Sequence, residues 1–218
     1  MIRVLAADDH PIVLEGLGRL LSKHEDMRLV GEASDGASIV QLAQDMLADV
    51  VLLDISMPGP GFAAVIRTLK KVRPRLAVLV LSAQPASQYA VRVLRAGAAG
   101  YVSKESLSEE LAHAIRETAT GRRYVSPSVA ASLVDAVAEV VERPPHETLS
   151  DREFDVLRFT ALGKPVKQIA QELGLSPKTV STYRRRVLDK LKLDSQAEAI
   201  RYAVSHGIVP AQESRDTP

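Results

Sequence analysis

The stretch DVVLLDISMPG, residues 49–59, joins an apolar run typical of a buried β-strand to a carboxylate, Asp54, at the end of that run. Ser56, Pro58 and Gly59 then predict a turn. A carboxylate at the end of a buried strand is costly unless other groups compensate it. The rest of the chain must therefore supply groups that lie near Asp54.

Apolar runs and amphipathic segments alternate over the first 120 residues. Apolar runs without polar alternation are typical of parallel strands that are covered on both faces. We expect strands at residues 2–7, 27–33, 49–54, 76–82 and 100–103, and helices at 11–21, 35–47, 62–72, 86–96 and 106–120, the last with Ser106 and Glu109 as a capping box. These strand–helix units predict an α/β doubly wound sheet of five parallel strands over residues 1–120.

Residues 149–209 have a different pattern, which predicts an all-α domain of four helices. The residues that start or end these helices are Ser150 with Glu153, Gly174, Ser176 with Pro177, and Ser195 with Glu198. Residues 1–120 carry 13 Lys and Arg against 14 Asp and Glu, a net charge of −1, whereas residues 149–209 carry 11 against 7, a net charge of +4. The basic second domain indicates a polyanionic partner.

The segment between the two domains, residues 121–148, is expected to be a linker. A helix in it would begin at Ser126 and Pro127 and end before RPPHET, residues 143–148. Residues 210–218 remain as a C-terminal tail. The chain has no Cys, which excludes disulfides and thiolate metal sites, and it has no run of transmembrane length. We therefore expect a cytoplasmic protein without a membrane partner.

Polar side chains follow most of the predicted strands. Asp8 and Asp9 follow the first strand, Asp54 ends the third, Ser82 ends the fourth and Lys104 follows the fifth. The carboxyl ends of parallel strands meet at one edge of a doubly wound sheet, so these groups should gather there. Carboxylates that lie this close repel each other by roughly a few kcal/mol per pair. A divalent cation among them would offset this repulsion. Oxygen ligands without His or Cys favour Mg²⁺, with Mn²⁺ as its replacement.

The chemistry that fits this set is phosphoryl transfer to Asp54, which would give an acyl phosphate. The cation and Lys104 would neutralise phosphoryl oxygens, and Ser82 would donate a hydrogen bond to one of them. Each residue alone has an ordinary explanation as a turn, loop or solvated residue. Their occurrence at successive strand ends is what favours a site. We interpret His10, which precedes Pro11, as a helix-start residue rather than a ligand.

The motifs AADDHP, VVLLDISMPG, LVLSAQ and GYVSKES resemble the receiver domain of two-component response regulators, over the first 120 residues. This resemblance implies a flavodoxin-like fold. It also implies Mg²⁺ binding by Asp9, Asp54 and the main-chain carbonyl of Ser56, with Asp8 acting mostly through water. The other roles that the resemblance implies are those of Asp54 as phospho-acceptor, Ser82 as switch hydroxyl, Tyr101 as switch aromatic residue and Lys104 as the ammonium group of the site.

The stretch SPKTVSTYRRRVLDKLK, residues 176–192, has six Lys and Arg and one Asp. At about 100° per residue, an apolar stripe and a cationic, hydroxylic face lie on opposite sides of this helix. The apolar stripe consists of Val180, Tyr183, Val187 and Leu191. The outward face consists of Lys178, Ser181, Thr182 and Arg185, and Thr179 and Arg186 flank it. Arg184 lies nearer the apolar stripe. A charged face is usually only solvated, but this one can enter the major groove of DNA.

Together with the preceding VKQIAQELG, this helix resembles the LuxR-type helix-turn-helix domain of the NarL/FixJ response regulators, over residues 149–209. LSDREFDVL, KQIAQELGLSPKTV and KLKLDSQAEAI carry the match. The resemblance implies base contacts from Ser181, Thr182 and Arg185, and phosphate contacts from Lys178 and Thr179.

These patterns predict a transcription regulator, not an enzyme, that a sensor histidine kinase switches by phosphorylating Asp54. We expect it to bind double-stranded DNA as a homodimer, through apolar surface that Ile200, Ala203 and Val204 leave on the last helix. One alternative is a regulator that does not depend on phosphorylation. Another is an aspartyl-phosphate phosphatase, which would need a general acid two residues after the nucleophile, where Ser56 stands.

Overall fold

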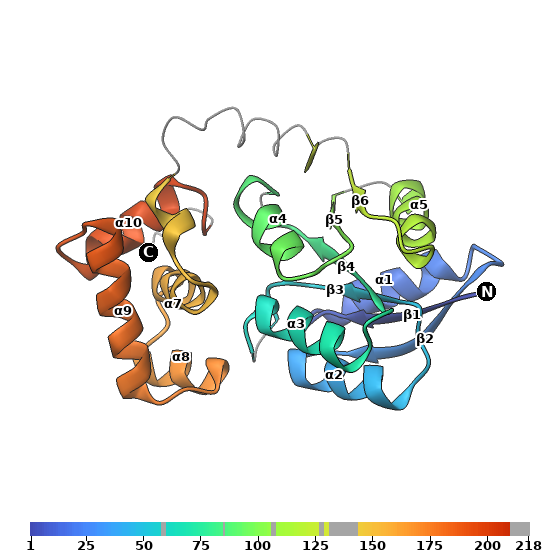
Figure 1. The fold of residues 1–218 in the computed structure, drawn as a ribbon, viewed down its shortest axis with the longest axis horizontal. Helices are drawn as coiled ribbons and strands as arrows, with labels where there is room; N and C mark the ends of the chain where they lie inside the picture. The colour runs from blue at the N-terminus through green and yellow to red at the C-terminus, as the bar shows by residue number, and fades with distance from the viewer. Residues whose placement is uncertain (58–59, 85, 106–107, 127–128, 131–143, 210–218) are drawn as a thin grey trace, which may run out of the picture. The chain divides into compact units, whose positions relative to one another are not determined.

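The computed structural model describes residues 1–57, 60–84, 86–105, 108–126, 129–130 and 144–209. It divides into two compact units, one from residues 1–139 and one from residues 140–218 (Figure 1). Among the described residues, no helix is long and apolar enough to cross a bilayer.

A parallel β-sheet forms the centre of the first unit. Its strands are β1 (Ile2–Ala7), β2 (Met27–Ala33), β3 (Val50–Leu53), β4 (Ala77–Ser82), β5 (Gly100–Ser103) and β6 (Tyr124–Val125), in the order β2-β1-β3-β4-β5-β6. All of the pairings are parallel. The predicted doubly wound parallel sheet is confirmed. β1 lies between β2 and β3, so the chain extends the sheet from β1 first in one direction, to β2, and then in the other, from β3 onward. This reversal is the topological switch point of the sheet.

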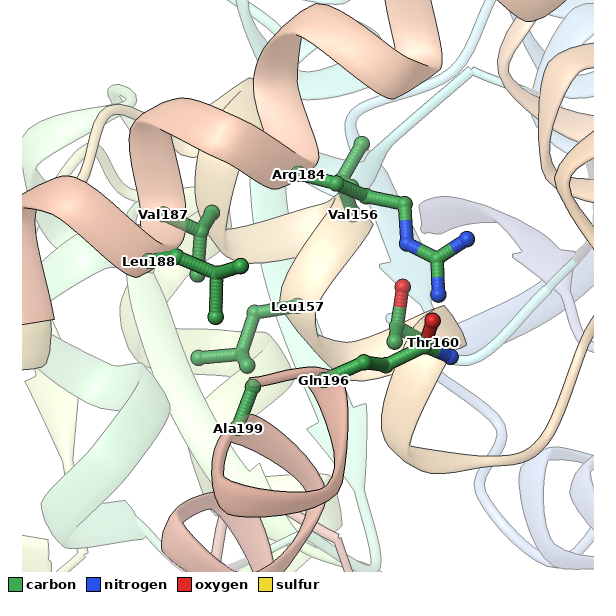
Figure 2. A pocket seen from close by; sticks show the side chains of 8 residues that line it. All are labelled: Val156, Leu157, Thr160, Arg184, Val187, Leu188, Gln196 and Ala199. Atoms are coloured by element: carbon green, nitrogen blue, oxygen red, sulfur yellow. The ribbon is translucent and has the colours of Figure 1, made fainter. Parts of the chain in front are cut away.

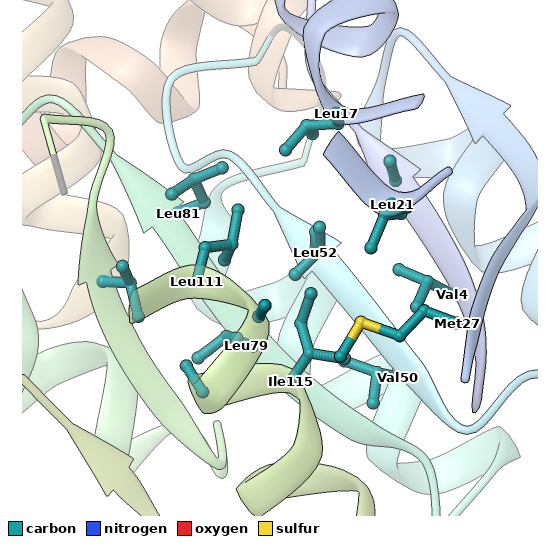
Figure 3. Close-up of a cluster of buried hydrophobic side chains, with 14 of the residues drawn as sticks. Val4, Leu17, Leu21, Met27, Val50, Leu52, Leu79, Leu81, Leu111 and Ile115 are labelled. Atoms are coloured by element: carbon teal, nitrogen blue, oxygen red, sulfur yellow. The ribbon is translucent and has the colours of Figure 1, made fainter. Parts of the chain in front are cut away.

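Helices cover both faces of this sheet, as the continuously apolar strands require. The helices are α1 (Pro11–Leu21), α2 (Gly36–Asp45), α3 (Phe62–Val72), α4 (Ala86–Arg95) and α5 (Ser108–Ala119). α1 and α5 pack on one face, where Leu21 and Ile115 meet strand residues such as Leu52 in one buried cluster (Figure 3). α3 packs between α2 and α4, and of these helices α2 contacts β1 and β2 and α4 contacts β5. Ser106 of the expected capping box lies outside the described residues.

The sheet has a sixth strand, β6, so the expectation of five strands is wrong by one. β6 is only two residues long, too short for periodicity to reveal, and it pairs with the edge of β5. Gly100 makes this close approach feasible, because a Cβ atom there would lie 2.3 Å from the Tyr124 carbonyl oxygen. Residues 124–125, which we had assigned to the linker, therefore belong to the sheet.

The second unit is helical. Its elements are the 3₁₀ helix η1 (Pro145–Thr148), α7 (Asp151–Ala161), α8 (Val166–Leu173), α9 (Pro177–Leu191) and α10 (Gln196–Ser205). Three of the predicted helix ends are confirmed: Ser150 and Glu153 form a capping box, Gly174 ends α8 in the left-handed conformation, and Ser176 caps α9. Ser195 also caps α10, but the capping box expected there is wrong, because Glu198 Oε2 accepts from the Asp194 N–H instead of the Ser195 N–H. Phe159, Ile169 and Val180 join α7, α8 and α9 in one buried cluster.

The last helix, α10, differs from its expectation at one residue. Ile200 and Val204 are half-buried, but Ala203 is completely buried within its own unit. The expectation that Ala203 leaves apolar surface is therefore wrong. Most of the helix expected from Ser126 and Pro127, and the tail at 210–218, lie outside the described residues.

We predict that Gly100→Ala lowers the free energy of unfolding of the first unit by about 1–3 kcal/mol, because the added methyl group must displace the Tyr124 carbonyl or Leu79. Urea unfolding followed by circular dichroism measures this. The matched control is Gly16→Ala in α1, where no atom lies within 4 Å of the new Cβ. It should raise the free energy of unfolding by about 0.5–1 kcal/mol. Equal effects of the two changes would contradict the close β5–β6 contact.

Candidate functional site

The predicted site residues lie together at the carboxyl edge of the sheet, at its switch point. The pairing of β1 with β3 continues one step beyond the strands, because the Asp54 N–H donates to the Ala7 carbonyl over 2.9 Å. β4 and β5 are joined in the same way, since the Lys104 N–H donates to the Ser82 carbonyl over 2.9 Å. Strand pairing therefore fixes which side chains become neighbours.

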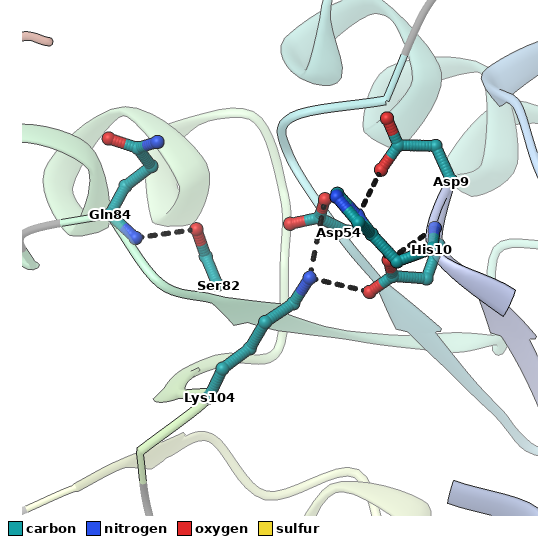
Figure 4. A network of polar contacts seen from close by, with 7 residues as sticks. Asp9, His10, Asp54, Ser82, Gln84 and Lys104 are labelled. Carbon is teal, nitrogen blue, oxygen red and sulfur yellow. Dashed lines mark hydrogen bonds and ion pairs between the residues drawn. The ribbon is translucent and has the colours of Figure 1, made fainter. Parts of the chain in front are cut away.

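Lys104 bridges the acidic side chains of this edge (Figure 4). Its Nζ lies 2.6 Å from Asp8 Oδ2 and 3.5 Å from Asp54 Oδ2. The sequence pattern assigned Lys104 to phosphoryl oxygens, whereas in this structure Asp8 is its nearer partner. Its ammonium group lies within reach of a group that joins to Asp54.

Asp54 is 3% exposed, and neither of its carboxylate oxygens has a hydrogen-bond partner among the described residues. Burial raises the pKa of the Asp54 carboxyl, the Lys104 charge and, more weakly, the nearby Ser56 backbone N–H oppose this shift, and Asp8 and Asp9 add to it. The three carboxylates of Asp8, Asp9 and Asp54 thus outnumber the ammonium group of Lys104 that lies among them. Such a set of unsatisfied carboxylate oxygens fits a hard divalent cation such as Mg²⁺.

His10 lies in the acidic cluster, although the sequence predicts a helix-start residue there and not a ligand. It is the N-cap residue of α1, as expected, but its Nδ1 lies 2.8 Å from Asp9 Oδ1 and 3.2 Å from Asp8 Oδ1. Ligand atoms of Asp8, Asp9 and His10 all lie within 4.8 Å of one another. His10 is adjacent to Asp9 in sequence and has extended backbone angles as the N-cap residue before Pro11.

The Gln84 backbone connects the two residues that the family resemblance assigned to the switch. Its N–H donates to Ser82 Oγ over 3.0 Å, and its carbonyl accepts from the Tyr101 hydroxyl over 2.7 Å. Ser82 and Tyr101 are both fully buried. Burial raises the pKa of the Tyr101 phenol to about 12, so it is protonated and able to donate. Sequence reasoning missed Gln84 because its backbone, not its side chain, makes these contacts.

Apolar side chains line a small pocket on the other side of Asp54. Met57, Phe62 and Val65 contribute to it, and Ser56 lies in the half-buried bend that follows β3. Asp54 itself is part of this lining, so the pocket adjoins the acceptor residue.

The α9 face divides as the helical wheel predicted. Val180, Val187 and Leu191 are buried, and Tyr183 is half-buried. The exposed residues are Lys178, Ser181, Thr182, Arg185 and Arg186, whereas Thr179 is half-buried. The hydroxyls of Ser181 and Thr182 donate to the carbonyls of Pro177 and Lys178, each over 3.0 Å, and Thr179 is bound to the cap residue Ser176.

One cationic residue of α9, Lys190, binds a carboxylate of α7 within the second unit. Lys190 Nζ donates to Glu153 Oε2 over 2.7 Å, and the same oxygen accepts from the Ser150 N–H over 2.8 Å. Glu153 is 3% exposed. The capping box of α7 therefore also holds the C-terminal part of α9, which no sequence signal announced because 37 residues separate the partners.

Comparison with family models gives two matches. Residues 4–116 match the response regulator receiver domain, and residues 147–203 match the bacterial regulatory proteins of the luxR family.

Among curated proteins, the response regulator GacA of Pseudomonas aeruginosa is 38% identical over 212 residues, which cover 97% of this chain and 99% of GacA. The response regulator UvrY of Escherichia coli is 34% identical and covers 97% of this chain and 98% of its own.

Solved structures of RcsB from Salmonella are similar to this chain. One, bound to the promoter rprA in the presence of the phosphomimetic BeF₃⁻, is 29% identical with a TM-score of 0.72, over 92% of this chain and 97% of its own. Another, described by its conformational dynamism for DNA interaction, is 29% identical with a TM-score of 0.77, over 94% of this chain and 97% of its own.

We predict that Asp54→Asn stabilises the first unit without divalent cations, by about 1–3 kcal/mol, because it removes a buried charge whose oxygens have no hydrogen-bond partner. Adding Mg²⁺ should stabilise the wild type and have less effect on the variant. Chemical unfolding with chelator and with Mg²⁺ measures both effects. Glu25→Gln, which removes the same charge at an exposed position, is the control and should change neither. An Asp54→Asn variant that is no more stable than this control would refute the assignment of Asp54 as a buried charge without hydrogen-bond partners.

Proposed function

The chain belongs to the response regulators that join a receiver domain to a luxR-type DNA-binding domain, and we propose that phosphorylation of Asp54 by a sensor histidine kinase controls its binding to double-stranded DNA. The observation that carries this proposal is the buried Asp54 carboxylate beside Lys104, in the same chain as a helix with an exposed cationic face. DNA as the partner places the proposed activity in the cytoplasm.

In the proposed reaction, an Asp54 oxygen attacks the phosphorus atom of a phosphohistidine. The new O–P bond forms as the P–N bond breaks, and the electron pair of that bond stays with the leaving imidazole. Lys104 holds a positive charge beside the acceptor, 3.5 Å from its Oδ2. Asp8, Asp9, Asp54 and the Ser56 carbonyl would hold a Mg²⁺ ion, whose charge would help to neutralise the phosphoryl oxygens.

The proposed switch runs from the acyl phosphate through Ser82 to Tyr101. A phosphoryl oxygen would accept a hydrogen bond from the Ser82 O–H, and the resulting movement of Ser82 would act on the Gln84 N–H, which at present donates to Ser82 Oγ. Because the Gln84 carbonyl also binds the Tyr101 hydroxyl, a shift of this backbone changes the packing of Tyr101. The surface beside β5 would then differ between the two states.

We assign the chain to regulators rather than enzymes. The phosphatase alternative needs a general acid two residues beyond the nucleophile, and the Ser56 hydroxyl has too high a pKa to act as one near neutral pH. A regulator that ignores phosphate would have no use for the unsatisfied Asp54 carboxylate.

For DNA binding, we propose that Ser181, Thr182 and Arg185 read base edges, while Lys178, Thr179 and Arg186 hold phosphates. Five of these six side chains are exposed. The sixth, Thr179, is half-buried and lies at the start of α9, where the helix N-terminus favours a phosphate. We further propose that two chains bind as a homodimer through Ile200 and Val204 of α10, which are half-buried.

The phosphorylation proposal predicts that incubation with acetyl phosphate and Mg²⁺ adds one phosphoryl group to the wild-type chain. Intact-mass spectrometry measures the addition, and chelation of Mg²⁺ should prevent it. The control is Asp9→Asn, which keeps the acceptor and should slow the reaction without changing the modified residue. Equal labelling of Asp54→Asn would exclude Asp54 as the acceptor.

The DNA proposal predicts different effects for two cations of α9. Arg185→Ala should cost about 1–3 kcal/mol on the cognate duplex and relax the preference at one base pair. Lys178→Ala should weaken all duplexes alike and reduce the salt slope by about one unit.

The measurement is binding of both variants to cognate and scrambled duplexes across a salt series. If Arg185→Ala weakened both duplexes equally, Arg185 would be a phosphate contact and the assigned base-reading face would be wrong.

A further inference from the structure

His10 turns a nitrogen atom toward the acidic side chains that follow β1. Its Nδ1 lies 2.8 Å from Asp9 Oδ1 and 3.2 Å from Asp8 Oδ1 (Figure 4). The ligands proposed above for Mg²⁺ are all oxygen atoms, so this nitrogen has no part in them. The His10 side chain also makes no capping hydrogen bond at the start of α1. The position of the ring is therefore not required by the helix.

The spacing of these atoms suits a transition-metal ion. Nitrogen and oxygen ligands lie about 2.0–2.2 Å from Zn²⁺, so neighbouring ligand atoms in a tetrahedral or octahedral site are about 3.0–3.5 Å apart. The two distances from His10 Nδ1 lie within or just below this range. Ligand atoms of Asp8, Asp9 and His10 all lie within 4.8 Å of one another, so small rotations of these side chains complete the set.

Solvent reaches the cluster at Asp9 and His10, whose side chains are 31% and 63% exposed. A hydrated ion can bind these two first and gain the buried Asp8 as it loses water. Asp8 Oδ1 accepts from the His10 N–H, and Asp8 Oδ2 lies 2.6 Å from Lys104 Nζ. A carboxylate has about four lone-pair positions, so Asp8 keeps a position for an ion.

Buried polar atoms in the second unit lack this access. Arg184 Nη2 and Thr160 Oγ1 have no hydrogen-bond partner among the described residues, and both residues line a pocket between α7, α9 and α10 (Figure 2). That pocket has room for only about one or two water molecules, and most of its lining residues are apolar. The acidic edge of the first unit is different because its outer side chains are exposed.

Charge and ligand type both select the ion. Asp8, Asp9 and Asp54 carry three carboxylates, and Lys104 offsets one of them, so one divalent cation balances the rest. Asp54 points independently to a cation, because its two buried oxygens have no hydrogen-bond partner within the described residues. Oxygen ligands alone favour Mg²⁺, whereas an imidazole nitrogen among them favours a transition-metal ion such as Zn²⁺.

We propose that His10, Asp8 and Asp9 form a binding site for a divalent transition-metal ion, represented by Zn²⁺, which competes with Mg²⁺ for the two carboxylates. Zn²⁺ in proteins is usually four-coordinate, so three protein ligands leave one open position, whereas six-coordinate Mg²⁺ keeps more. A cation that binds both Asp54 and a phosphoryl oxygen needs two such positions. Zn²⁺ therefore slows phosphorylation of Asp54, a consequence that rests on the proposed function.

Titration of the full chain with Zn²⁺, at constant pH and ionic strength, tests the site. In NMR spectra, His10 Nδ1 should take the ¹⁵N chemical shift of a metal-bound nitrogen with Zn²⁺ but not with Mg²⁺. Calorimetry gives the affinities. Loss of an outer partner of a metal ligand already costs about 10–100-fold in affinity, so His10→Gln should weaken Zn²⁺ binding by about 10-fold or more. Mg²⁺ binding should weaken far less, because Mg²⁺ takes oxygen ligands.

Two further variants serve as controls. His113→Gln removes an exposed histidine of the same unit, whose ring packs edge-on against Tyr124, and it should leave the Zn²⁺ affinity of the site unchanged. Asp9→Asn should weaken the binding of both ions, because both need this carboxylate.

Phosphorylation by acetyl phosphate gives a second readout. With Mg²⁺ present, Zn²⁺ should slow the addition of the phosphoryl group, and excess Mg²⁺ should restore it. The Zn²⁺ concentration that halves each protein's own rate should be about 10-fold or more higher for His10→Gln than for the wild type. A wild-type chain that accepts no phosphoryl group would refute the proposed function, while the titrations would still decide this inference.

Three outcomes would overturn the inference. Equal Zn²⁺ affinities of the wild type and His10→Gln would show that His10 is not a ligand. Equal losses of Zn²⁺ and Mg²⁺ affinity in His10→Gln would mean that His10 only orients the acids. Zn²⁺ that supports phosphorylation as well as Mg²⁺ does would refute the competition.

Discussion

The buried carboxylate of Asp54 is the constraint on which the first unit depends. The backbone N–H of Asp54 extends the β1–β3 pairing, so the residue cannot leave the edge of the sheet without breaking that bond. The same pairing brings the buried Asp8 close by, and the two acids then share the single ammonium group of Lys104. The resulting shortage of positive charge is a cost in the isolated chain. It is also what makes the edge responsive, because a cation or a phosphoryl group changes the balance of charge there.

In the second unit, packing holds α9 in place while one side of that helix stays exposed. Val180 and Val187 anchor α9 in the hydrophobic cluster and core of the unit. Glu153 adds a polar anchor, because it completes the capping box of α7 and binds Lys190 at the other end of α9. α9 is thus fixed at both ends by residues that take no part in its exposed face.

Most of this organisation could be predicted from the sequence, for a physical reason. Strands buried on both faces need unbroken apolar runs, and helices need caps at their ends, so both leave local signals such as VVLL before Asp54 and Ser150 with Glu153. The chemistry of the first site was accessible because parallel strands bring their ends to one edge. Contacts that depend on the exact path of the backbone left no signal: the short pairing of Tyr124 with Gly100, the return of His10 to Asp9, and the contacts of the Gln84 backbone. Burial of Ala203 depends on how α10 packs, which periodicity alone does not determine.

The hydroxyls of Ser181 and Thr182 spend their donors on the preceding turn of α9. Within the described residues they hold no other element in place, and Arg185 beside them is exposed. Exchange of such surface residues usually changes the free energy of folding little. On the proposed assignment of these side chains to base edges, the set of promoters that the protein recognises can change over evolutionary time while the fold is retained, so that one inherited input can acquire new target genes.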